Sequence, residues 1–359
     1  METGNAIELK GVTKRFGDVI ANDNVNLTVR KGEILSILGE NGSGKTTLMN
    51  MLSGIYFPDE GEVYVDGKEV TIRSPKDSFA LGIGMIHQHF KLINILTAAE
   101  NIILGLPGKE KLNMKQVEKE IRELTEQYGF DLNPSQKIYD MSVSQKQTVE
   151  IVKVLYRGAD ILILDEPTAV LTPQETEKLF AVLRNMRKAG KSIIIITHKL
   201  NEVLELSDRV AVLRKGKYID TVETAKATVE SLTEMMVGEK VKLDINRTEP
   251  VGAEKRIEMR GITCRNKEGL KVLTEASFTA YSGEILGVAG ISGSGQKELL
   301  ESVAGLQPIE SGEILYFSPE GTTEKISEMK AEDIKNLGIT LSFVPEDRLG
   351  MGLVGSMDL

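Results

Sequence analysis

The sequence predicts an α/β fold built on a parallel core sheet, and features at three places in the chain indicate it. Apolar runs occupy residues 34–38, 161–164 and 193–196. Such runs are typical of parallel strands that helices cover on both faces. A glycine-rich loop at residues 39–46 and a helix-like segment follow the first run directly, which is the order of a strand–loop–helix unit that binds phosphate.

Other segments predict two further parts beside the core sheet. Three segments alternate apolar and polar side chains: residues 6–12, 23–29 and 61–70. We expect them to form an antiparallel flanking sheet. Residues 97–155 contain charged helical sequence in which Val117 and Ile121 recur on one face, so this stretch predicts a helical subdomain.

The chain also contains an internal repeat of domain size. The pattern that begins at Gly11 recurs from Gly261, about 250 positions later, a spacing too long for a solenoid. Residues 241–255 between the two copies are polar and lack a sustained period, as expected of a linker. The sequence therefore predicts a complete nucleotide-binding domain at residues 1–240, a linker at 241–255, and the N-terminal part of a second, degenerate copy at 256–359.

Composition limits the classes of partner and compartment. The chain has 359 residues, 41% hydrophobic content, a net charge of -9 and a pI near 5.2, which argues against a general nucleic-acid binder. Its one cysteine, Cys264, cannot form an internal disulfide, and no amino-terminal apolar segment resembles a secretion signal; together these favour the cytosol. No apolar run approaches the ~20 residues that a membrane-spanning helix needs.

The glycine-rich loop carries the clearest functional pattern. It reads Gly39, Glu40, Asn41, Gly42, Ser43, Gly44, Lys45, Thr46, which is the G-x-x-x-x-G-K-[ST] phosphate loop. Glycines allow successive N–H groups to face one centre, Lys45 adds a charge for the β- and γ-phosphates, and the Thr46 hydroxyl can bind Mg²⁺. A simple glycine-rich turn is the alternative, but the strand and helix on either side favour a nucleoside triphosphate site.

Polar residues follow both of the later apolar runs. Asp165 comes at the end of the second run, where a carboxylate can orient Mg²⁺ through water, and Glu166 beside it can polarise water. A helix cap or turn before Pro167 is the structural alternative for this pair. His198 follows the third run, at an edge where ligands collect in open α/β sheets, and we interpret it as a γ-phosphate contact rather than an ordinary polar histidine.

In this set of motifs the chain resembles the ATP-binding subunits of ABC transporters. The matching residues are Phe16, the loop at residues 39–46, Gln88, the sequence Asp165-Glu166-Pro167-Thr168, and His198. The resemblance implies the P-loop NTPase fold in its ABC ATPase form, with ATP and Mg²⁺ as ligands. It covers about the first 240 residues, and so many ordered motifs are much more specific than one short pattern.

The resemblance also implies roles for individual residues. Phe16 corresponds to the aromatic residue that stacks on adenine. The implied catalytic residues are Glu166, His198, Gln88 and Lys45. The implied nucleotide-binding residues are Phe16, Gly39, Glu40, Asn41, Gly42, Ser43, Gly44, Lys45, Thr46, Thr47, Gln88 and Asp165. The implied Mg²⁺ ligands, partly through water, are Thr46, Gln88 and Asp165.

The chain resembles, more narrowly, the tandem-domain subfamily that energises import of simple sugars and nucleosides in bacteria. Three features carry this resemblance: the fused second copy, the sequence at residues 88–90, and residues 344–353. The form of residues 86–90 favours nucleosides. The resemblance implies integral membrane permease subunits and an extracytoplasmic solute-binding protein as partners, no nucleic acid, and peripheral association with the cytoplasmic face of the cell membrane. The alternative is a soluble tandem ABC protein acting on ribosomes, but such proteins normally keep both sites competent and have a long charged helical linker.

The chain departs from the family pattern in both copies. Residues 141–145 lack the two glycines of the usual Leu-Ser-Gly-Gly-Gln signature, with Val143 and Ser144 in their place, and a Cβ hinders close approach to phosphate. In the second copy Gln296 and Lys297 replace the lysine and the hydroxyl residue of the loop. Asn266 and Glu346 stand where the first copy has Phe16 and Gln88. We expect one hydrolytic site and one structural or regulatory site in a complete protein.

Overall fold

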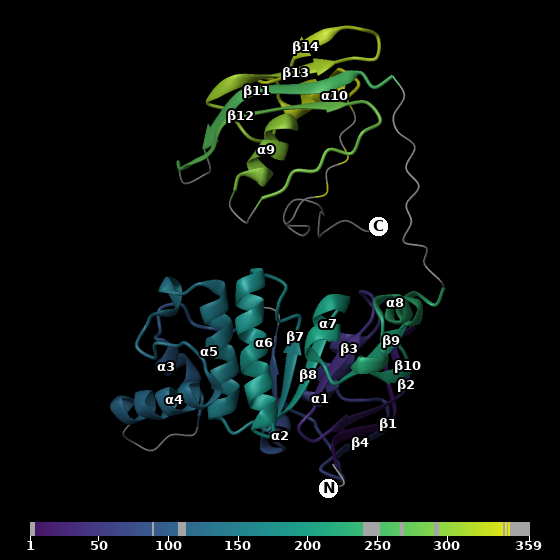
Figure 1. Cartoon of the computed structure of the whole chain (residues 1–359), viewed down its shortest axis with the longest axis vertical. Coiled ribbons are helices and arrows are strands. Elements are labelled where there is room, and N and C mark those ends of the chain that lie inside the picture. The colour runs from purple at the N-terminus through teal and green to yellow at the C-terminus, as the bar shows by residue number, and fades with distance from the viewer. Residues whose placement is uncertain are drawn as a thin grey trace. The chain divides into compact units, whose positions relative to one another are not determined.

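The computed structural model of the chain (Figure 1) describes residues 4–87, 90–106, 113–239, 252–265, 269–290 and 294–339, together with Ser342 and Val344. The chain divides into two compact units, residues 1–243 and 244–359. Most of the predicted linker lies outside the described residues, and strand β11 begins at Lys255. Among the described helices, none combines the length and apolar character needed to cross a membrane.

The first unit contains the predicted antiparallel flank as a four-stranded sheet of order β2-β1-β4-β5. Its strands are β1 (Asn5–Phe16), β2 (Val19–Arg30), β4 (Glu60–Val65) and β5 (Lys68–Val70). Successive side chains of a strand point to opposite faces of the sheet. Along β1 and β2, the apolar side chains on the face toward the core, such as Ile7, Leu9 and Leu27, are buried. A tight hairpin joins these two strands, with Phe16 paired to Val19.

A six-stranded sheet of order β10-β9-β3-β8-β7-β6 forms the centre of the first unit. Its strands are β3 (Ile34–Leu38), β6 (Ile83–Ile86), β7 (Ile161–Asp165), β8 (Ser192–Thr197), β9 (Arg209–Arg214) and β10 (Lys217–Glu223). Neighbours from β6 to β9 are parallel, and β10 is antiparallel to β9. Every residue of β3, β7 and β8 is buried, which confirms that their apolar runs are doubly covered core strands.

Most helices of the first unit begin at a residue whose side chain caps them, whereas α1 and α7 have no side-chain cap. The helices of the first unit are α1 (Lys45–Leu52), α2 (Pro75–Ala80), α3 (Ala98–Ile103), α4 (Met114–Tyr128), α5 (Val143–Tyr156), α6 (Pro173–Lys188), α7 (Leu200–Leu206) and α8 (Val229–Val237). Short 3-10 turns occupy Ile138–Asp140 and Thr224–Lys226. Thr97, Ser142 and Thr172 each form a capping box at the start of α3, α5 and α6. Helices α3, α4 and α5 lie together on the side of the unit opposite β1, β2 and β4 (Figure 1) and form the predicted helical subdomain.

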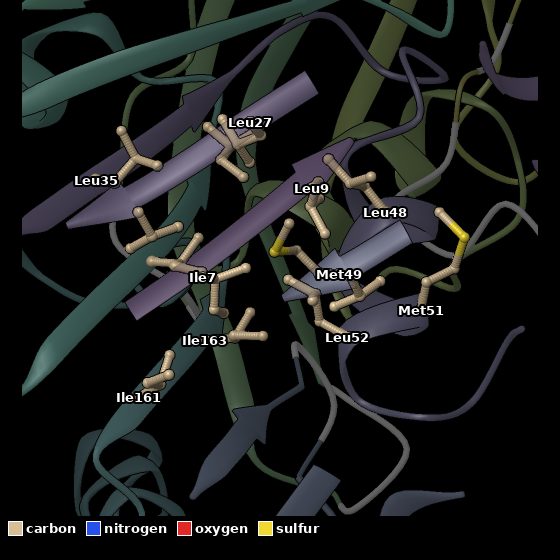
Figure 2. Packing of buried hydrophobic residues seen from close by; sticks show 14 of the residues in the cluster. Ile7, Leu9, Leu27, Leu35, Leu48, Met49, Met51, Leu52, Ile161 and Ile163 are labelled. Carbon is tan, nitrogen blue, oxygen red and sulfur yellow. The ribbon is translucent and has the colours of Figure 1, made fainter. Parts of the chain in front are cut away.

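Helix α1 is held between the two sheets of the first unit. Figure 2 shows Leu48, Met49 and Leu52 of this helix packed with side chains from both sheets. The partners labelled there come from the flanking sheet (Ile7, Leu9, Leu27) and from the core sheet (Leu35, Ile161, Ile163). Each fully buried side chain of this size stabilises the fold by roughly 1.5–3 kcal/mol. The apolar packing therefore fixes the start of α1, and with it the glycine-rich loop, against the core sheet.

The second unit contains a smaller antiparallel sheet of order β12-β11-β13-β14, the order that the β2-β1-β4-β5 sheet has in the first unit. Its elements are β11 (Lys255–Arg265), β12 (Lys271–Tyr281), β13 (Ser311–Phe317), β14 (Thr323–Lys325), α9 (Gln296–Val303) and α10 (Ala331–Asn336). Its core contains Met259, Ile262, Leu299 and Ile314.

The same sequence pattern has different outcomes in the two units. In the first unit, β3 pairs with β8 on one side and β9 on the other, and its side chains are buried. In the second unit, the corresponding Ile285, Leu286 and Val288 are exposed, and the described residues of that unit include no parallel neighbours for them. An apolar run becomes a core strand only where partners complete its hydrogen bonds.

Candidate active site

The glycine-rich loop connects β3 to α1, and its path requires glycine at two tightly packed places. Gly44 caps α1 with a φ of 92°, and a Cβ on it would lie 2.3 Å from the carbonyl oxygen of Ala21. A Cβ on Gly39 would lie 2.3 Å from the carbonyl oxygen of Leu213. The side-chain amide of Asn22 donates to the carbonyl of Gly44 at 3.2 Å. Neighbouring strands thus hold the loop in a shape that side-chain-bearing residues cannot adopt.

Lys45 lies folded against its own loop. Its Nζ donates to the carbonyl oxygens of Gly39 and Glu40, both at 2.8 Å, and the residue is only 6% exposed. Burial lowers the pKa of this ammonium group, and the charges of Glu166, Asp165 and Glu40 oppose that shift. The Lys45 ammonium group is therefore held in one place, where it can contact bound phosphate, and does not extend into solvent.

Thr46 and Asp165 form the candidate magnesium site. The Thr46 hydroxyl donates to Oδ2 of Asp165 at 3.3 Å, so oxygen donors from the start of α1 and the end of β7 face each other. Burial raises the pKa of Asp165, and Glu166 raises it further, against the opposing effects of Thr46 and Lys45. Carboxylate and hydroxyl oxygens are the hard ligands that Mg²⁺ prefers. The donor set therefore fits this ion.

Glu166 and His198 meet at the same edge of the core sheet. Oε1 of Glu166 lies 2.9 Å from Nδ1 of His198, although 32 positions separate the residues in the chain. Glu166 has a φ of 47°, and its N–H donates to the carbonyl of Ile196 on β8 at 2.9 Å. The carboxylate is thus positioned by both the strand that carries it and the neighbouring strand.

One cleft collects most of the residues expected at the site. Its predicted members are Asn41, Gly42, Ser43, Gly44, Lys45, Thr46, Thr47, Asp165, Glu166 and His198. The sequence did not single out six further residues of the lining as site residues: Val19, Ile20, Ala21, Ile196, Lys215 and Gly216. Ile196 lies in β8, and the others lie in β2 or in the turn before β10, where no short motif marks the positions.

Other predicted residues lie beside this cleft or outside the described part of the chain. Gly39 and Glu40 contribute carbonyl oxygens to Lys45 and do not line the cleft. Phe16 lies at the hairpin before Val19, is 43% exposed, and packs edge-on against Tyr56 with ring centroids 5.1 Å apart. Gln88 lies outside the described residues, as do Asn266 and Glu346.

The substituted signature loop lies at the start of α5. Ser142 caps this helix, and Ser144 donates to Oε1 of Glu175 on α6 at 2.6 Å. That hydrogen bond is the main cause of the lowered pKa of Glu175. Ser142, Ser144 and Gln145 line a second cavity between α5 and α6, separate from the cleft at the phosphate loop. Ser144 therefore makes a contact that glycine at this position could not make.

The altered loop of the second unit keeps part of the backbone geometry. Gly295 caps α9 with a φ of 89°, and a Cβ on it would lie 2.6 Å from the carbonyl oxygen of Val272 on β12, matching Gly44 and Ala21. A Cβ on Gly290 would lie 2.7 Å from the amide nitrogen of Gln296. The Gln296 side chain thus lies against the first glycine of its loop, as Lys45 does in the first unit, but without a charge.

Comparison with known proteins gives one consistent result. The sequence profile of the ABC transporter family matches residues 22–169. The nucleoside import ATP-binding protein NupA of Lactococcus lactis is 45% identical over 99% of this chain and 70% of its own length. The chain belongs to the ABC transporter family. As an ABC ATPase, it has an α/β nucleotide-binding fold in its first unit.

Further relatives and solved structures agree with this assignment. The guanosine import ATP-binding protein NupO of Bacillus subtilis is 43% identical, with 97% of this chain and 67% of the relative aligned. The glucose import ATP-binding protein TsgD13 of Haloferax volcanii is 40% identical, with 98% and 68% aligned. An ATP-binding cassette crystallised in its ADP conformation aligns over 66% of this chain and 96% of its own length, with 27% identity and a TM-score of 0.57. A dimeric cassette bound to ADP and Pi aligns over 61% and 98%, with 29% identity and a TM-score of 0.53.

Proposed function

We propose that this ABC ATPase is the energy-coupling subunit of an importer for nucleosides or simple sugars, with nucleosides favoured. The observation that carries the proposal is the convergence of Lys45, Thr46, Asp165, Glu166 and His198 on one cleft. The relatives named for import of nucleosides and of guanosine support the favoured cargo, while the relative named for glucose import keeps sugars as the second class. These names favour an importer over the ribosomal alternative.

The proposed chemistry follows from the arrangement of the cleft. Backbone N–H groups of the loop and the Lys45 ammonium group bind the β- and γ-phosphates of ATP. Mg²⁺ held by Thr46 and Asp165 would neutralise charge on the phosphate oxygens. Glu166 orients the attacking water and accepts its proton, and His198 steadies both the Glu166 carboxylate and the γ-phosphate. Gln88 would complete the ligand set and report the state of the phosphate.

A groove in the first unit supports docking of a membrane partner. Its lining, among the described residues, includes apolar Ile55, Phe79 and Met85, and its cations Lys91, Lys153 and Arg157 outnumber its one carboxylate, Glu150. His87, the neighbour of Gln88 in the chain, also lines it. An apolar groove with basic side chains suits an amphipathic helix that carries an acidic residue. In the proposal this helix belongs to a permease subunit at the cytoplasmic face of the membrane, and a solute-binding protein delivers cargo on the opposite side.

The two units have unequal roles in this proposal. Gln296 leaves the second loop without the lysine charge, and Val143 and Ser144 alter the first unit's signature loop. The altered loop of the second unit would have a structural or regulatory role, and the site at residues 39–46 would hydrolyse ATP.

A transport assay with a matched pair of variants tests the function. Full-length protein is reconstituted with its permease subunits and solute-binding protein in liposomes, and ATP-driven uptake of labelled guanosine and of labelled ribose is measured. We expect uptake of guanosine, its loss in Glu166→Gln, and its retention in Glu177→Gln, which alters an exposed carboxylate of α6. Uptake of ribose without uptake of guanosine would indicate that the cargo is a sugar. Co-sedimentation with ribosomes and no uptake of either compound would overturn the importer proposal.

A further inference from the structure

The backbone of Glu166 has a conformation that needs support from its surroundings. Its φ of 47° lies in the left-handed region, which costs a residue with a side chain about 1–2 kcal/mol. Such a conformation persists only where neighbouring groups fix the chain on both sides. The N–H of Glu166 donates to the carbonyl oxygen of Ile196, and side chains from two helical regions hold the two residues that follow.

A glutamine from α5 fixes the first of them. Nε2 of Gln147 donates to the carbonyl oxygen of Pro167 at 2.7 Å, and Gln147 is only 4% exposed. A buried side-chain amide bonded to a buried carbonyl is costly to displace, because either group alone would lose its partner without gaining water. Pro167 therefore cannot shift without moving α5 or breaking this bond.

A lysine and a glutamate from the opposite side fix Thr168. Nζ of Lys199 donates to the carbonyl oxygen of Thr168 at 3.0 Å. The same nitrogen donates to the Thr168 hydroxyl at 3.2 Å and to Oε1 of Glu202 at 2.9 Å. The Thr168 hydroxyl donates to the other carboxylate oxygen of Glu202 at 2.5 Å, and Thr168 is 2% exposed. The lysine thus reaches the same threonine through its main chain and its side chain, and the glutamate completes the ring of contacts.

Lys199 is adjacent to His198 in the chain, and this adjacency links the network to the reaction. One residue after β8 contacts the Glu166 carboxylate, and the next holds the chain two residues beyond Glu166. Any movement of the β8–α7 connection would therefore move His198 and the loop of Glu166 together. The network fixes the distance between the carboxylate and the imidazole.

We propose that Lys199, acting through Thr168 and Glu202, is a positioning residue that holds Glu166 against His198 for ATP hydrolysis. This inference rests on the proposed function, in which Glu166 orients the attacking water. Gln147 is the second anchor of the same loop. Loss of the lysine would lower the rate of the chemical step while leaving the phosphate loop, and hence nucleotide affinity, unchanged.

Another lysine at the opposite end of β8 provides a matched control. Lys191 precedes the strand, and its Nζ donates to the carbonyl oxygen of Ala159 at 2.9 Å and to Oδ1 of Asp160 at 2.6 Å. Like Lys199, it joins a backbone carbonyl to a carboxylate. It contacts none of the residues of the cleft, so Lys191→Met reports the general effect of removing such a lysine.

The test measures kcat and KM for ATP in the full-length protein with its membrane partners. We expect Lys199→Met and Thr168→Val to lower kcat about 10-fold or more, with KM changed less than about 2-fold, because small displacements of a catalytic group reduce the rate steeply. Thr168→Ser, which keeps the hydroxyl, and Lys191→Met should retain most of the wild-type kcat. Thermal unfolding of each variant shows whether it has folded.

A double variant separates positioning from a structural effect. If Lys199 acts through Glu166, Lys199→Met should cause no further loss in a Glu166→Gln background. An equal further loss in that background, or full kcat in folded Lys199→Met and Thr168→Val, would overturn the positioning role alone. Normal turnover in Glu166→Gln would overturn the proposed chemistry, and the role of Lys199 with it.

Discussion

The hydroxyl oxygen of Thr46 lies 3.3 Å from Oδ2 of Asp165, although the two residues are 119 positions apart in the chain. Parallel pairing of the core strands explains this contact. Strands β3 and β7 both pair with β8, so the loop after β3 and the carboxylate at the end of β7 reach the same edge of the sheet. The triphosphate site therefore depends on the order of the core strands as much as on the loop motif.

Asp165→Asn should weaken binding of Mg-ATP without lowering the stability of the fold at neutral pH. Burial raises the pKa of Asp165, so the folded protein binds this proton more tightly than the unfolded chain does. The free energy of unfolding therefore falls as pH rises from the ordinary value of 3.8 through the raised pKa. The asparagine keeps an acceptor for Thr46 but has no charge, so the variant should lose less stability over this pH range.

Urea unfolding at several pH values, together with calorimetry of Mg-ATP binding, checks this expectation. The variant should be at least as stable as wild type at neutral pH and should bind Mg-ATP much more weakly. In wild type, Mg²⁺ binding should weaken with falling pH, and it should do so at a higher pH than it would if Asp165 had the ordinary pKa of 3.8. A variant that is less stable at neutral pH would contradict the assigned cost of burying this charge.

Gly44→Ala and Gly42→Ala should differ, although both glycines have positive φ. The φ values are 92° and 80°, so either alanine costs about 1 kcal/mol in backbone strain. Only at Gly44 does a Cβ also meet a backbone atom, at 2.3 Å from the carbonyl oxygen of Ala21, whereas nothing lies within 4 Å of a Cβ at Gly42. Gly44→Ala should lower the free energy of unfolding by about 2–3 kcal/mol. Thermal unfolding of the two variants measures this difference, and equal losses would show that strain alone determines the cost.

Phe16→Ala should reduce affinity for the base and not for the phosphates. The ring is 43% exposed at the hairpin beside Val19. Nζ of Lys14 lies 5.4 Å from its centroid, and its contact with Tyr56 is T-shaped, so a planar ligand would stack on the part of the ring that these two residues leave exposed. Stacking on a base contributes about 1–3 kcal/mol, so the Kd for ATP should rise about 10-fold while that for inorganic triphosphate stays constant. Phe57→Ala, which removes a similarly exposed ring beside Arg73, is the control. A parallel loss of triphosphate affinity in Phe16→Ala would indicate damage to the loop instead.

The sequence was sufficient to predict three strands of the core sheet, β3, β7 and β8, and the residues at their ends, but not β6, β9 and β10. Apolar runs and the loop motif have local signatures, and parallel strands bring their ends together, so the proximity of Lys45, Asp165, Glu166 and His198 could be expected. The contacts of Lys199 and Gln147 could not be predicted. They depend on the left-handed turn at Glu166 and on the path of the loop after it, and no periodicity or motif encodes these features.

Ser144 shows the limit of interpreting a departure from a family pattern as a simple loss. From the sequence, serine in place of glycine indicated only a hindered approach to phosphate. In the structure its hydroxyl joins α5 to α6 through Glu175, a partner 31 positions away. A pairwise contact between side chains on separate helices leaves no trace in the local sequence around either residue.

Ser144→Ala should therefore destabilise the first unit in a pH-dependent way. The hydrogen bond from Ser144 is the main cause of the lowered pKa of Glu175, and a depressed carboxyl pKa contributes stability that is present above the ordinary value of 4.5 and is lost as pH falls through the lowered one. At neutral pH we expect a loss of about 1 kcal/mol, which is below the ~1.5–3 kcal/mol of other bonds to charged groups because Glu175 is partly exposed and solvent screens its charge. The loss should shrink in acid. Urea unfolding of Ser144→Ala, Glu175→Gln and the double variant measures the coupling, and a loss that persists unchanged through acid pH would mean that the carboxylate is not the partner that matters.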